Sequence, residues 1–375
     1  MTVNRDLFLF LKSYSSGAAG ILRKISSVGH RTLGHRVGST AAKVIAVSAT
    51  FALLLISLYA IGAFAKLLEE PYTNFLYYPE VDAGEILRLF KAGKEPTYGV
   101  LNPYERYVFT IRNEGRCYTL QEKRSNMTLL LVVKSALNHR SRRDAIRQTW
   151  GQEYRFPGVA LRRVFMVGVD SKDPSVQDAL NSEQAINGDL VQAEFEDTYF
   201  NNTIKTMLSF RWILEQCPNV HWFLFVDDDY YVSAKNLIEF VKDKDGSSER
   251  LWTGFVVESL RPQRHLWGKW YLPLSEYPYS HFPSYVNAGA YVLSRCSLID
   301  LYRVARFTPQ FRFDDVFLAI LAKKIGLEPR YSNKFRYFIE PRTEEDFAGL
   351  VAAHGFHDPV RLVKTLEWQR RLGQA

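Results

Sequence analysis

From about residue 126 onward, the chain alternates short apolar runs with segments of helical spacing. The apolar runs predict strands at 129–133, 164–169, 190–195 and 222–226. Helices are predicted between them at 141–150, 176–187 and 203–216. Ser141, with Asp144 three residues later, has the spacing of a capping box at the first helix.

This alternation predicts an α/β layer fold with a largely parallel sheet. No internal repeat or low-complexity tract interrupts the pattern. Ligands in such sheets bind at the carboxyl ends of strands, so polar residues that directly follow an apolar run are the first candidates for a site.

A much longer apolar run covers residues 44–65 and contains no charged side chain. As a helix rising about 1.5 Å per residue, it can span a hydrocarbon layer of roughly 30 Å. A core helix is the alternative, but core helices seldom stay uncharged over this length. A cleaved signal peptide would have its apolar stretch nearer Met1. The run therefore predicts one transmembrane signal-anchor helix.

The distribution of charge orients this helix. The chain has 48 Lys and Arg against 40 Asp and Glu, a net charge of +8. Residues 1–43 hold seven basic side chains and one acidic one, so six of the eight charges precede the apolar run. The positive-inside rule places 1–43 in the cytosol and the chain after 65 in the lumen, a type II topology. The remainder is nearly neutral, which argues against a nucleic-acid partner.

The predicted organisation has four parts. They are a cytosolic basic tail (1–43), the transmembrane helix (44–65), a proline-containing stem without sustained period (66–124) and a luminal domain (125–375). Glycosylation sequons at Asn126 and Asn201 agree with a luminal location. Of Cys117, Cys217 and Cys296, at most one pair can form an intramolecular disulfide, and spacing does not indicate which.

Three consecutive aspartates, Asp227, Asp228 and Asp229, follow the apolar strand 222–226. Like charges on adjacent residues repel, and burial raises that cost, so the cluster favours a bound cation. Oxygen ligands suit Mg²⁺ or Mn²⁺, especially where substrate phosphates complete the shell. The alternative is a solvated acidic loop.

A second acidic pair, Asp314-Asp315, opens the apolar run 316–321, which reads as a helix. The helix dipole stabilises carboxylates in a first turn, so the pair is either structural or contains an ionised base. His354 is a lone histidine in an apolar segment and is either a packed residue or a metal ligand. The aromatic segment 267–271 either packs in the core or offers flat faces to sugar rings.

At these residues the sequence resembles the inverting glycosyltransferase family of β1,3-galactosyltransferases and β1,3-N-acetylglucosaminyltransferases. The resemblance runs from about residue 128 to about residue 356. It rests on five motifs in order, at 142–151, 196–206, 227–229, 287–294 and 313–318. It implies a GT-A-like, Rossmann-type mixed sheet flanked by helices, a UDP-sugar donor, Mn²⁺ or Mg²⁺, and a Golgi membrane location.

The resemblance also implies roles for individual residues. Asp229 and His354 are expected to bind the metal, with Asp227 and Asp228 beside the donor. Asp315 is expected to be the base that deprotonates the acceptor hydroxyl. Arg143 and Lys205 are expected on the donor side by their family positions, and surface salt bridges are the alternative for both.

Two motifs depart from the family pattern. Asp314-Asp315-Val316 stands where the family has Glu-Asp-Val, and a single glycine, Gly289, stands where it has two or three. The motifs look most like the invertebrate brainiac-type branch, which implies transfer of N-acetylglucosamine in β1,3 linkage to the mannose of a glycosphingolipid. Galactose transfer, or a glycoprotein acceptor, is the alternative.

Two other classes of function compete with this reading. A membrane-tethered phosphohydrolase with two metals usually gathers several His and Asp ligands, but the chain has only eight histidines. A non-catalytic luminal carbohydrate-binding protein could keep both acidic clusters. UDP release from a panel of UDP-sugars distinguishes it from an enzyme.

Overall fold

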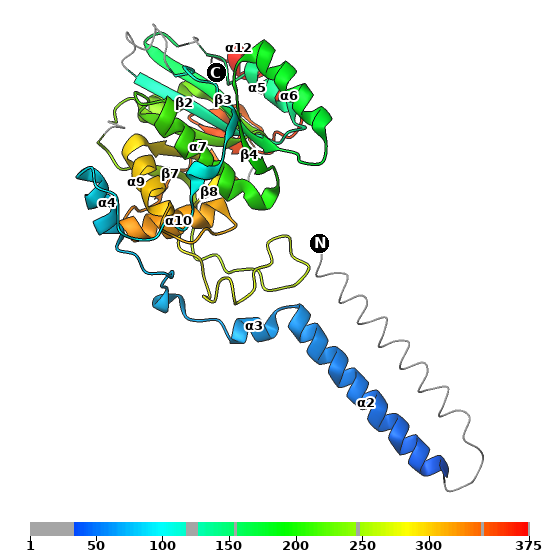
Figure 1. The fold of residues 1–375 in the computed structure, drawn as a ribbon. Helices are drawn as coiled ribbons and strands as arrows, with labels where there is room; N and C mark the ends of the chain where they lie inside the picture. The colour runs from blue at the N-terminus through cyan, green and yellow to red at the C-terminus, as the bar shows by residue number, and fades with distance from the viewer. Residues whose placement is uncertain (1–33, 118–126, 154–155, 245–247, 339–340, 374–375) are drawn as a thin grey trace. The chain divides into compact units, whose positions relative to one another are not determined.

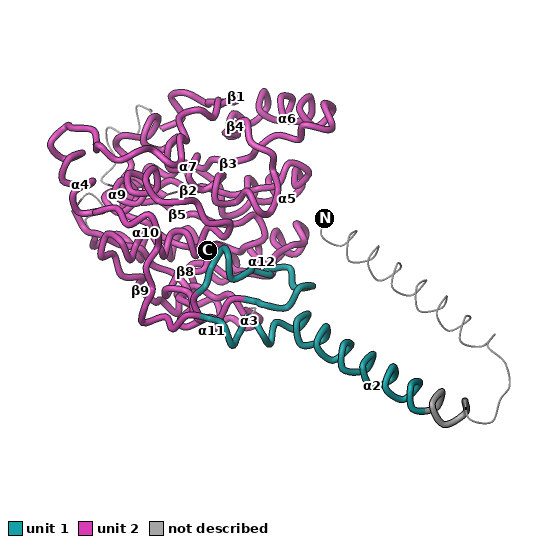
Figure 2. The backbone as a smooth tube through the Cα atoms, turned by 60° about the horizontal axis from the view of Figure 1, so that its bottom comes forward, with its two compact units in different colours: residues 1–69, 263–278 teal, residues 70–262, 279–375 magenta. Residues whose placement is uncertain are grey.

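The computed structural model describes residues 34–117, 127–153, 156–244, 248–338 and 341–373, with side chains from residue 40. The chain forms two compact units, coloured separately in Figure 2. One comprises residues 1–69 and 263–278, and the other 70–262 and 279–375.

The first unit contains the predicted apolar helix. Helix α2 spans Gly34–Ala60, and its portion Thr40–Ala60 is long and apolar enough to cross a membrane. The predicted run to residue 65 is not one helix, because Gly62 adopts φ 78°, a left-handed conformation that ends the helical path. A short helix, α3 (Ala63–Leu67), follows.

The second unit is built on a mixed sheet, part of which is labelled in Figure 1. The sheet has eight strands in the order β1-β4-β3-β2-β5-β8-β7-β9. Its strands are β1 (Phe109–Ile111), β2 (Met127–Lys134), β3 (Val159–Val169), β4 (Leu190–Glu196), β5 (Trp222–Asp227), β7 (Trp252–Val257), β8 (Tyr285–Ser294) and β9 (Arg330–Tyr331). Strands β4, β3, β2 and β5 are parallel to one another, whereas β1 joins β4, β8 joins β5 and β7 joins β8 in antiparallel pairs. Strand β9 pairs in parallel with β7. The predicted α/β class and the mixed sheet are confirmed, and so are all four predicted strands.

Helices cover both faces of this sheet. They are α4 (Ala83–Lys91), α5 (Arg140–Gln148), α6 (Pro174–Asn187), α7 (Asn202–Gln216), α8 (Ala234–Val241), α9 (Arg295–Ala305), α10 (Asp314–Ile325), α11 (Glu344–Phe347) and α12 (Pro359–Arg371). Helix α5 packs with α12, while α7, α9 and α10 pack with one another. Alternate side chains of β2 are buried on either face, as expected for a strand covered on both sides.

The predicted helices are confirmed, but the predicted capping box is wrong. Helix α5 begins at Arg140, one residue before Ser141, and its N-cap His139 makes no side-chain capping bond. Asp144 instead accepts a hydrogen bond from Arg140 at 2.9 Å. Ser141 therefore lies inside the helix.

A small second sheet, in the order β10-β11-β6, joins distant parts of the chain. Strand β11 (Ala352–His354) pairs antiparallel with β6 (Tyr230–Val232) and parallel with β10 (Phe335–Arg336). In this register His354 lies opposite Tyr230. This pairing places His354 beside Tyr230, the residue that directly follows the three aspartates.

The segment 70–117 belongs to the second unit by its contacts. The predicted boundary at residue 125 stays a prediction. Strand β1 extends the sheet by pairing with β4, and the backbone N–H groups of Leu101 and Asn102 donate to Arg306 O. Most of the predicted stem is thus folded structure, held by contacts between residues distant in sequence.

The disulfide joins Cys117 to Cys217 across 100 residues of sequence. Reducing it should destabilise the second unit by about 2–5 kcal/mol, because the unfolded chain then regains the entropy of a long open loop. Thermal unfolding of the full chain with and without reductant measures this loss. Cys296→Ser is the matched control, because Cys296 is the free cysteine. An unchanged transition on reduction would contradict the prediction.

Candidate active site

The candidate site begins where two parallel strands end side by side. Lys134 closes β2 and lies in register with Asp227, which closes β5. From β2 the chain proceeds through β3 and β4 towards one edge, and β5 lies on the other side of β2. Ligands of α/β sheets bind at such a switch point, outside the carboxyl ends of the strands.

The buried Lys134 connects the two acidic clusters. Its Nζ lies 3.2 Å from Asp227 Oδ1 and 3.0 Å from Asp314 Oδ2, and it donates to Ala288 O at 3.0 Å. Burial lowers the pKa of Lys134, but the charges of Asp227 and Asp314 outweigh burial and raise that pKa overall. The Thr206 hydroxyl also donates to Asp314 at 2.9 Å. Asp314 is thus a buried ion-pair partner at the start of α10.

Asp315 has a different environment from its neighbour. Its Oδ1 accepts the backbone N–H of Val316 at 2.8 Å. Burial, and then the negative charge of Asp314, raise the pKa of Asp315 to about 7. Tyr337 has a raised pKa from burial and then from the charges of Asp315, Asp227 and Asp229. Lys134 pairs with both Asp227 and Asp314, so the two acidic clusters form one site.

Asp228 is turned towards the loop that follows β2. It accepts the Ser135 hydroxyl at 2.6 Å and Arg142 at 2.9 Å, and its carboxylate lies 2.9 Å from His139 Nδ1. Burial raises the pKa of Asp228, but the hydrogen bonds with His139 and Ser135 outweigh burial and lower it overall. Asp228 holds this loop in place, and its contact with a donor stays a prediction.

Arg143 and Lys205 support the same loop. Arg143 is fully buried, pairs with Glu183 at 2.8 Å and donates to Ser135 Oγ. Lys205 is also buried and bridges Asp197 and Ser135 O. Neither is the surface salt-bridge residue considered as an alternative. Both stabilise the loop beside the strand ends, and direct donor contact by either stays a prediction.

Asp229 lies beside two histidines. Its Oδ2 is 3.6 Å from His354 Nε2 and 3.1 Å from His357 Nδ1, and one ligand atom from each residue falls within 4.8 Å of the others. The backbone N–H of Phe356 donates to Asp229 O at 2.8 Å, which fastens the returning chain to the acidic turn. Asp229 Oδ1 is buried without a hydrogen-bond partner among the described residues.

His357 was missed from the sequence. The spacing His354-Gly-Phe-His357 was visible, but two histidines three residues apart do not indicate a metal site unless a further ligand is known. What makes His357 informative is the pairing of β11 with β6, which brings both histidines to Asp229. Lys134 was missed as well, because nothing local marks a lysine at a strand end as a buried bridge.

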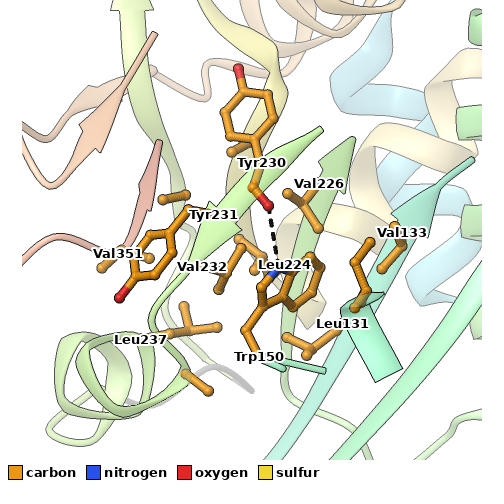
Figure 3. Packing of buried hydrophobic residues seen from close by; sticks show 14 of the residues in the cluster. Leu131, Val133, Trp150, Leu224, Val226, Tyr230, Tyr231, Val232, Leu237 and Val351 are labelled. Carbon is orange, nitrogen blue, oxygen red and sulfur yellow. Dashed lines mark hydrogen bonds between the residues drawn. The ribbon is translucent and has the colours of Figure 1, made fainter. Parts of the chain in front are cut away.

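Trp150 stabilises the turn that contains the aspartates. Figure 3 shows its indole packed near Leu131 and Leu224, with Nε1 donating to Tyr230 O at 3.2 Å. Trp150 is almost completely buried. This accounts for the large aromatic residue near the end of the 142–151 motif, since the hydrogen bond from its ring fixes the backbone of Tyr230, which follows Asp229.

Gly289 is required by the close approach of Tyr230. A Cβ at position 289 would lie 2.1 Å from the Tyr230 hydroxyl. Tyr230 also packs against the ring of His354, with ring centres 5.2 Å apart. Gly289→Ala should displace Tyr230 and cost about 1–3 kcal/mol of stability, as overpacking typically does.

Activity of Gly289→Ala should fall with stability, because Tyr230 adjoins Asp229. Turnover at several Mn²⁺ concentrations, together with thermal unfolding, measures both effects. Gly349→Ala is the control for stability, since a Cβ there meets nothing within 4 Å although its φ of 70° carries its own strain. Parent-like turnover of Gly289→Ala would show that Tyr230 has no influence on the site.

The two predicted glycosylation sites differ in what the structure shows. Asn126 lies outside the described residues. The Asn201 amide donates to Glu196 O at 2.8 Å, and the hydroxyl of Thr203 is buried and donates to Phe311 O at 2.7 Å. A glycan on Asn201 would have to displace the first of these bonds, and its glycosylation stays a prediction.

Comparison with known proteins places the chain in a family. The family model described as "Galactosyltransferase" matches residues 141–333. The β1,3-galactosyltransferase brn of Drosophila melanogaster is 43% identical over 239 residues, which cover 63% of this chain and 72% of that protein. The lactosylceramide 1,3-N-acetyl-β-D-glucosaminyltransferase A of Xenopus laevis is 34% identical over 232 residues, 60% of each chain.

Among solved structures, the galactosyltransferase LgtC in complex with donor and acceptor sugar analogues covers 66% of this chain and 100% of its own. Its sequence identity is 12% and its TM-score 0.35, and a likeness at that score supports no inference about this chain. The family match and the Drosophila relative carry the assignment. The chain belongs to the galactosyltransferase family and is a hexosyltransferase of its β1,3-galactosyl- and β1,3-N-acetylglucosaminyltransferase group.

Proposed function

We propose that this chain is an inverting, metal-dependent enzyme that transfers N-acetylglucosamine from UDP-N-acetylglucosamine in β1,3 linkage to the mannose of a glycosphingolipid. The observation that carries the proposal is that Asp229, with its two histidines, and the Asp314-Asp315 pair form separate clusters in one site that Lys134 connects. The motif resemblance to the brainiac-type branch supports the acceptor. The names of several relatives, including the Xenopus laevis enzyme that acts on lactosylceramide, support N-acetylglucosamine and a lipid acceptor.

Asp229, His354 and His357 would hold the metal ion. The Oδ1 atom of Asp229 is buried and has no hydrogen-bond partner among the described residues, so a bound cation would satisfy it. The three ligand atoms are close enough to bind one ion. Two imidazoles beside one carboxylate suit Mn²⁺ better than Mg²⁺, which takes oxygen ligands. When bound, the ion would supply positive charge to the diphosphate that leaves.

Asp315 would take the proton of the acceptor hydroxyl. A base must be ionised to act, and catalysis is most efficient when its pKa lies near the working pH. Burial and Asp314 move the pKa of Asp315 towards neutrality. Lys134 and Thr206 both donate hydrogen bonds to the neighbouring Asp314. These bonds fix the first turn of α10 and therefore the position of Asp315.

A second candidate is β1,3-galactosyl transfer from UDP-galactose. It is favoured by the printed name of the Drosophila melanogaster relative, a β1,3-galactosyltransferase at 43% identity. The two candidates share every residue of the proposed mechanism and differ only in the donor sugar.

The test is a donor-by-acceptor matrix on the purified full chain with Mn²⁺, measuring UDP release. UDP-N-acetylglucosamine with a β-mannosyl glycolipid should give the highest rate. Highest release from UDP-galactose would establish the second candidate, and no release with any pair would leave the non-catalytic binding protein considered above.

We further propose a Golgi membrane location with the folded second unit in the lumen. The apolar helix Thr40–Ala60 and the basic residues before it support this topology. Protease added to sealed vesicles should then remove only the short tail. Digestion of the whole chain without detergent would contradict the topology.

A further inference from the structure

The loop 263–278 lies in the sequence between β7 and β8 but belongs to the same compact unit as helix α2, as Figure 2 shows. The backbone N–H of Leu266 donates to the carbonyl of Ala60, the last residue of α2, at 3.0 Å. A Cβ at Gly62 would lie 2.5 Å from the backbone oxygen of Arg264. Only a glycine allows the two segments to approach this closely.

A buried ion pair fixes the same loop. Arg264 and Glu69 lie 2.9 Å apart, with side chains 0% and 3% exposed. Arg264 also donates to the carbonyls of Leu272 and Tyr277, at 2.7 and 2.8 Å. Burying a charged pair is costly unless its remaining hydrogen bonds are made, and here the guanidinium binds the backbone of the loop as well. The loop is therefore held at the end of α2.

The tip of this loop exposes large aromatic side chains. Trp267 is 68% exposed and Trp270 43% exposed, although such rings are usually covered. Nearby in the same unit, α3 exposes Phe64 and Leu67. The Lys269 Nζ lies 5.6 Å from the centre of the Trp270 ring, so a cation accompanies the aromatic pair. Large exposed apolar side chains gathered in one compact unit are typical of a protein or membrane binding surface.

We propose that Trp267 and Trp270 insert into the luminal interface of the membrane that α2 crosses, so that the loop forms a second membrane contact. Tryptophan is enriched at membrane–water interfaces, where its ring is apolar and its N–H can be hydrated. The end of α2 sets the level at which the chain leaves the hydrocarbon, and the bond from Leu266 to Ala60 places the loop at that level. Lys269 is exposed beside Trp270 and would pair with lipid phosphates. This inference rests on the proposed membrane anchor.

Tryptophan fluorescence tests the proposal on the full chain in phosphatidylcholine nanodiscs. One lipid carries bromine near the headgroup end of its acyl chains and another near the bilayer centre. Of the seven tryptophans, four are at most 2% exposed and Trp368 is half-buried. Bromine near the headgroups should quench the parent more than bromine at the centre. Replacing both Trp267 and Trp270 by Phe should abolish most of this quenching.

Trp368→Phe is the matched control and should retain the quenching of the parent. Trp267→Phe alone should lose part of it, which keeps the test decisive if the double variant folds poorly. Quenching of the folded double variant equal to that of the parent would overturn the proposal. Co-flotation with vesicles distinguishes the membrane anchor from the membrane contact of the loop. A chain that floats with vesicles but is not quenched by bromine overturns only the loop contact. A chain that does not float overturns the anchor as well.

Discussion

Replacing Asp315 by Asn is expected to lower turnover by about 10²–10⁴-fold, the usual contribution of a positioned general base. Asparagine keeps the size of the side chain and can still accept the N–H of Val316, so α10 should begin at the same residue. Only the ability to take a proton is lost. Added Mn²⁺ should not restore the rate, because the metal ligands are untouched.

Asp173→Asn is the matched control for Asp315→Asn. Asp173 caps α6 and accepts the N–H of Ser175 at 3.0 Å, so it is also an aspartate at a helix start. Its replacement should leave turnover within twofold of the parent, roughly the effect of an ordinary surface change. Near-normal turnover in Asp315→Asn would remove Asp315 as the base. Asp314→Asn is a poorer control, because Asp314 is buried against Lys134.

The pH profile gives an independent view of Asp315. Its pKa is raised to about 7, so the carboxyl group binds a proton as the pH falls through that value. The ionised form is the base, and kcat/KM should therefore rise with pH up to about 7 and level off above it. The residual activity of Asp315→Asn should lack this rise. An acid limb near pH 4, where an ordinary Asp titrates, would contradict the raised pKa.

The second large effect is expected at the residues proposed to bind the metal. Asp229→Asn and His357→Ala should each raise the Mn²⁺ concentration needed for half-maximal activity at least about tenfold, the lower end of what even outer-shell partners of a metal contribute. Excess Mn²⁺ should partly rescue both variants. The effect should be larger for Asp229, because it alone supplies negative charge to the three-residue cluster.

His221→Ala is the control for the metal variants, because this exposed histidine adjoins the amino end of β5, opposite the site. Activity titrations with Mn²⁺ on purified full-length variants measure the shift. A His357→Ala enzyme with the metal requirement of the parent would exclude His357 as a ligand and leave the other two residues of the cluster.

The parts of the fold that could be predicted are those encoded locally. The strands β2, β3, β4 and β5 are nearly continuous apolar runs in the sequence, because they are buried on both faces of the sheet. The position of the aspartates after β5 followed from the same pattern, since polar residues at the end of a buried strand lie at the ligand-binding edge.

What could not be predicted depends on contacts between distant residues. Residues 70–117 have no period of their own and are ordered by the edge pairing of β1 and by the disulfide to Cys217. Arg143 looks like a surface or ligand-binding residue in sequence, yet its charge is buried against Glu183. The cluster of Asp229, His354 and His357, proposed to bind the metal, forms only because β11 pairs with β6, and this pairing has no local signal in the sequence.

The measurement that tests the central claim most directly is calorimetric binding of UDP-N-acetylglucosamine with Mn²⁺ to three proteins: the parent, Asp229→Asn and Asp315→Asn. The metal and donor are assigned to one acidic cluster, and proton transfer to the other. Asp315→Asn should therefore bind the donor as the parent does while failing to turn over, and Asp229→Asn should bind it much more weakly. Equal loss of donor binding in both variants would contradict the separation of the two roles.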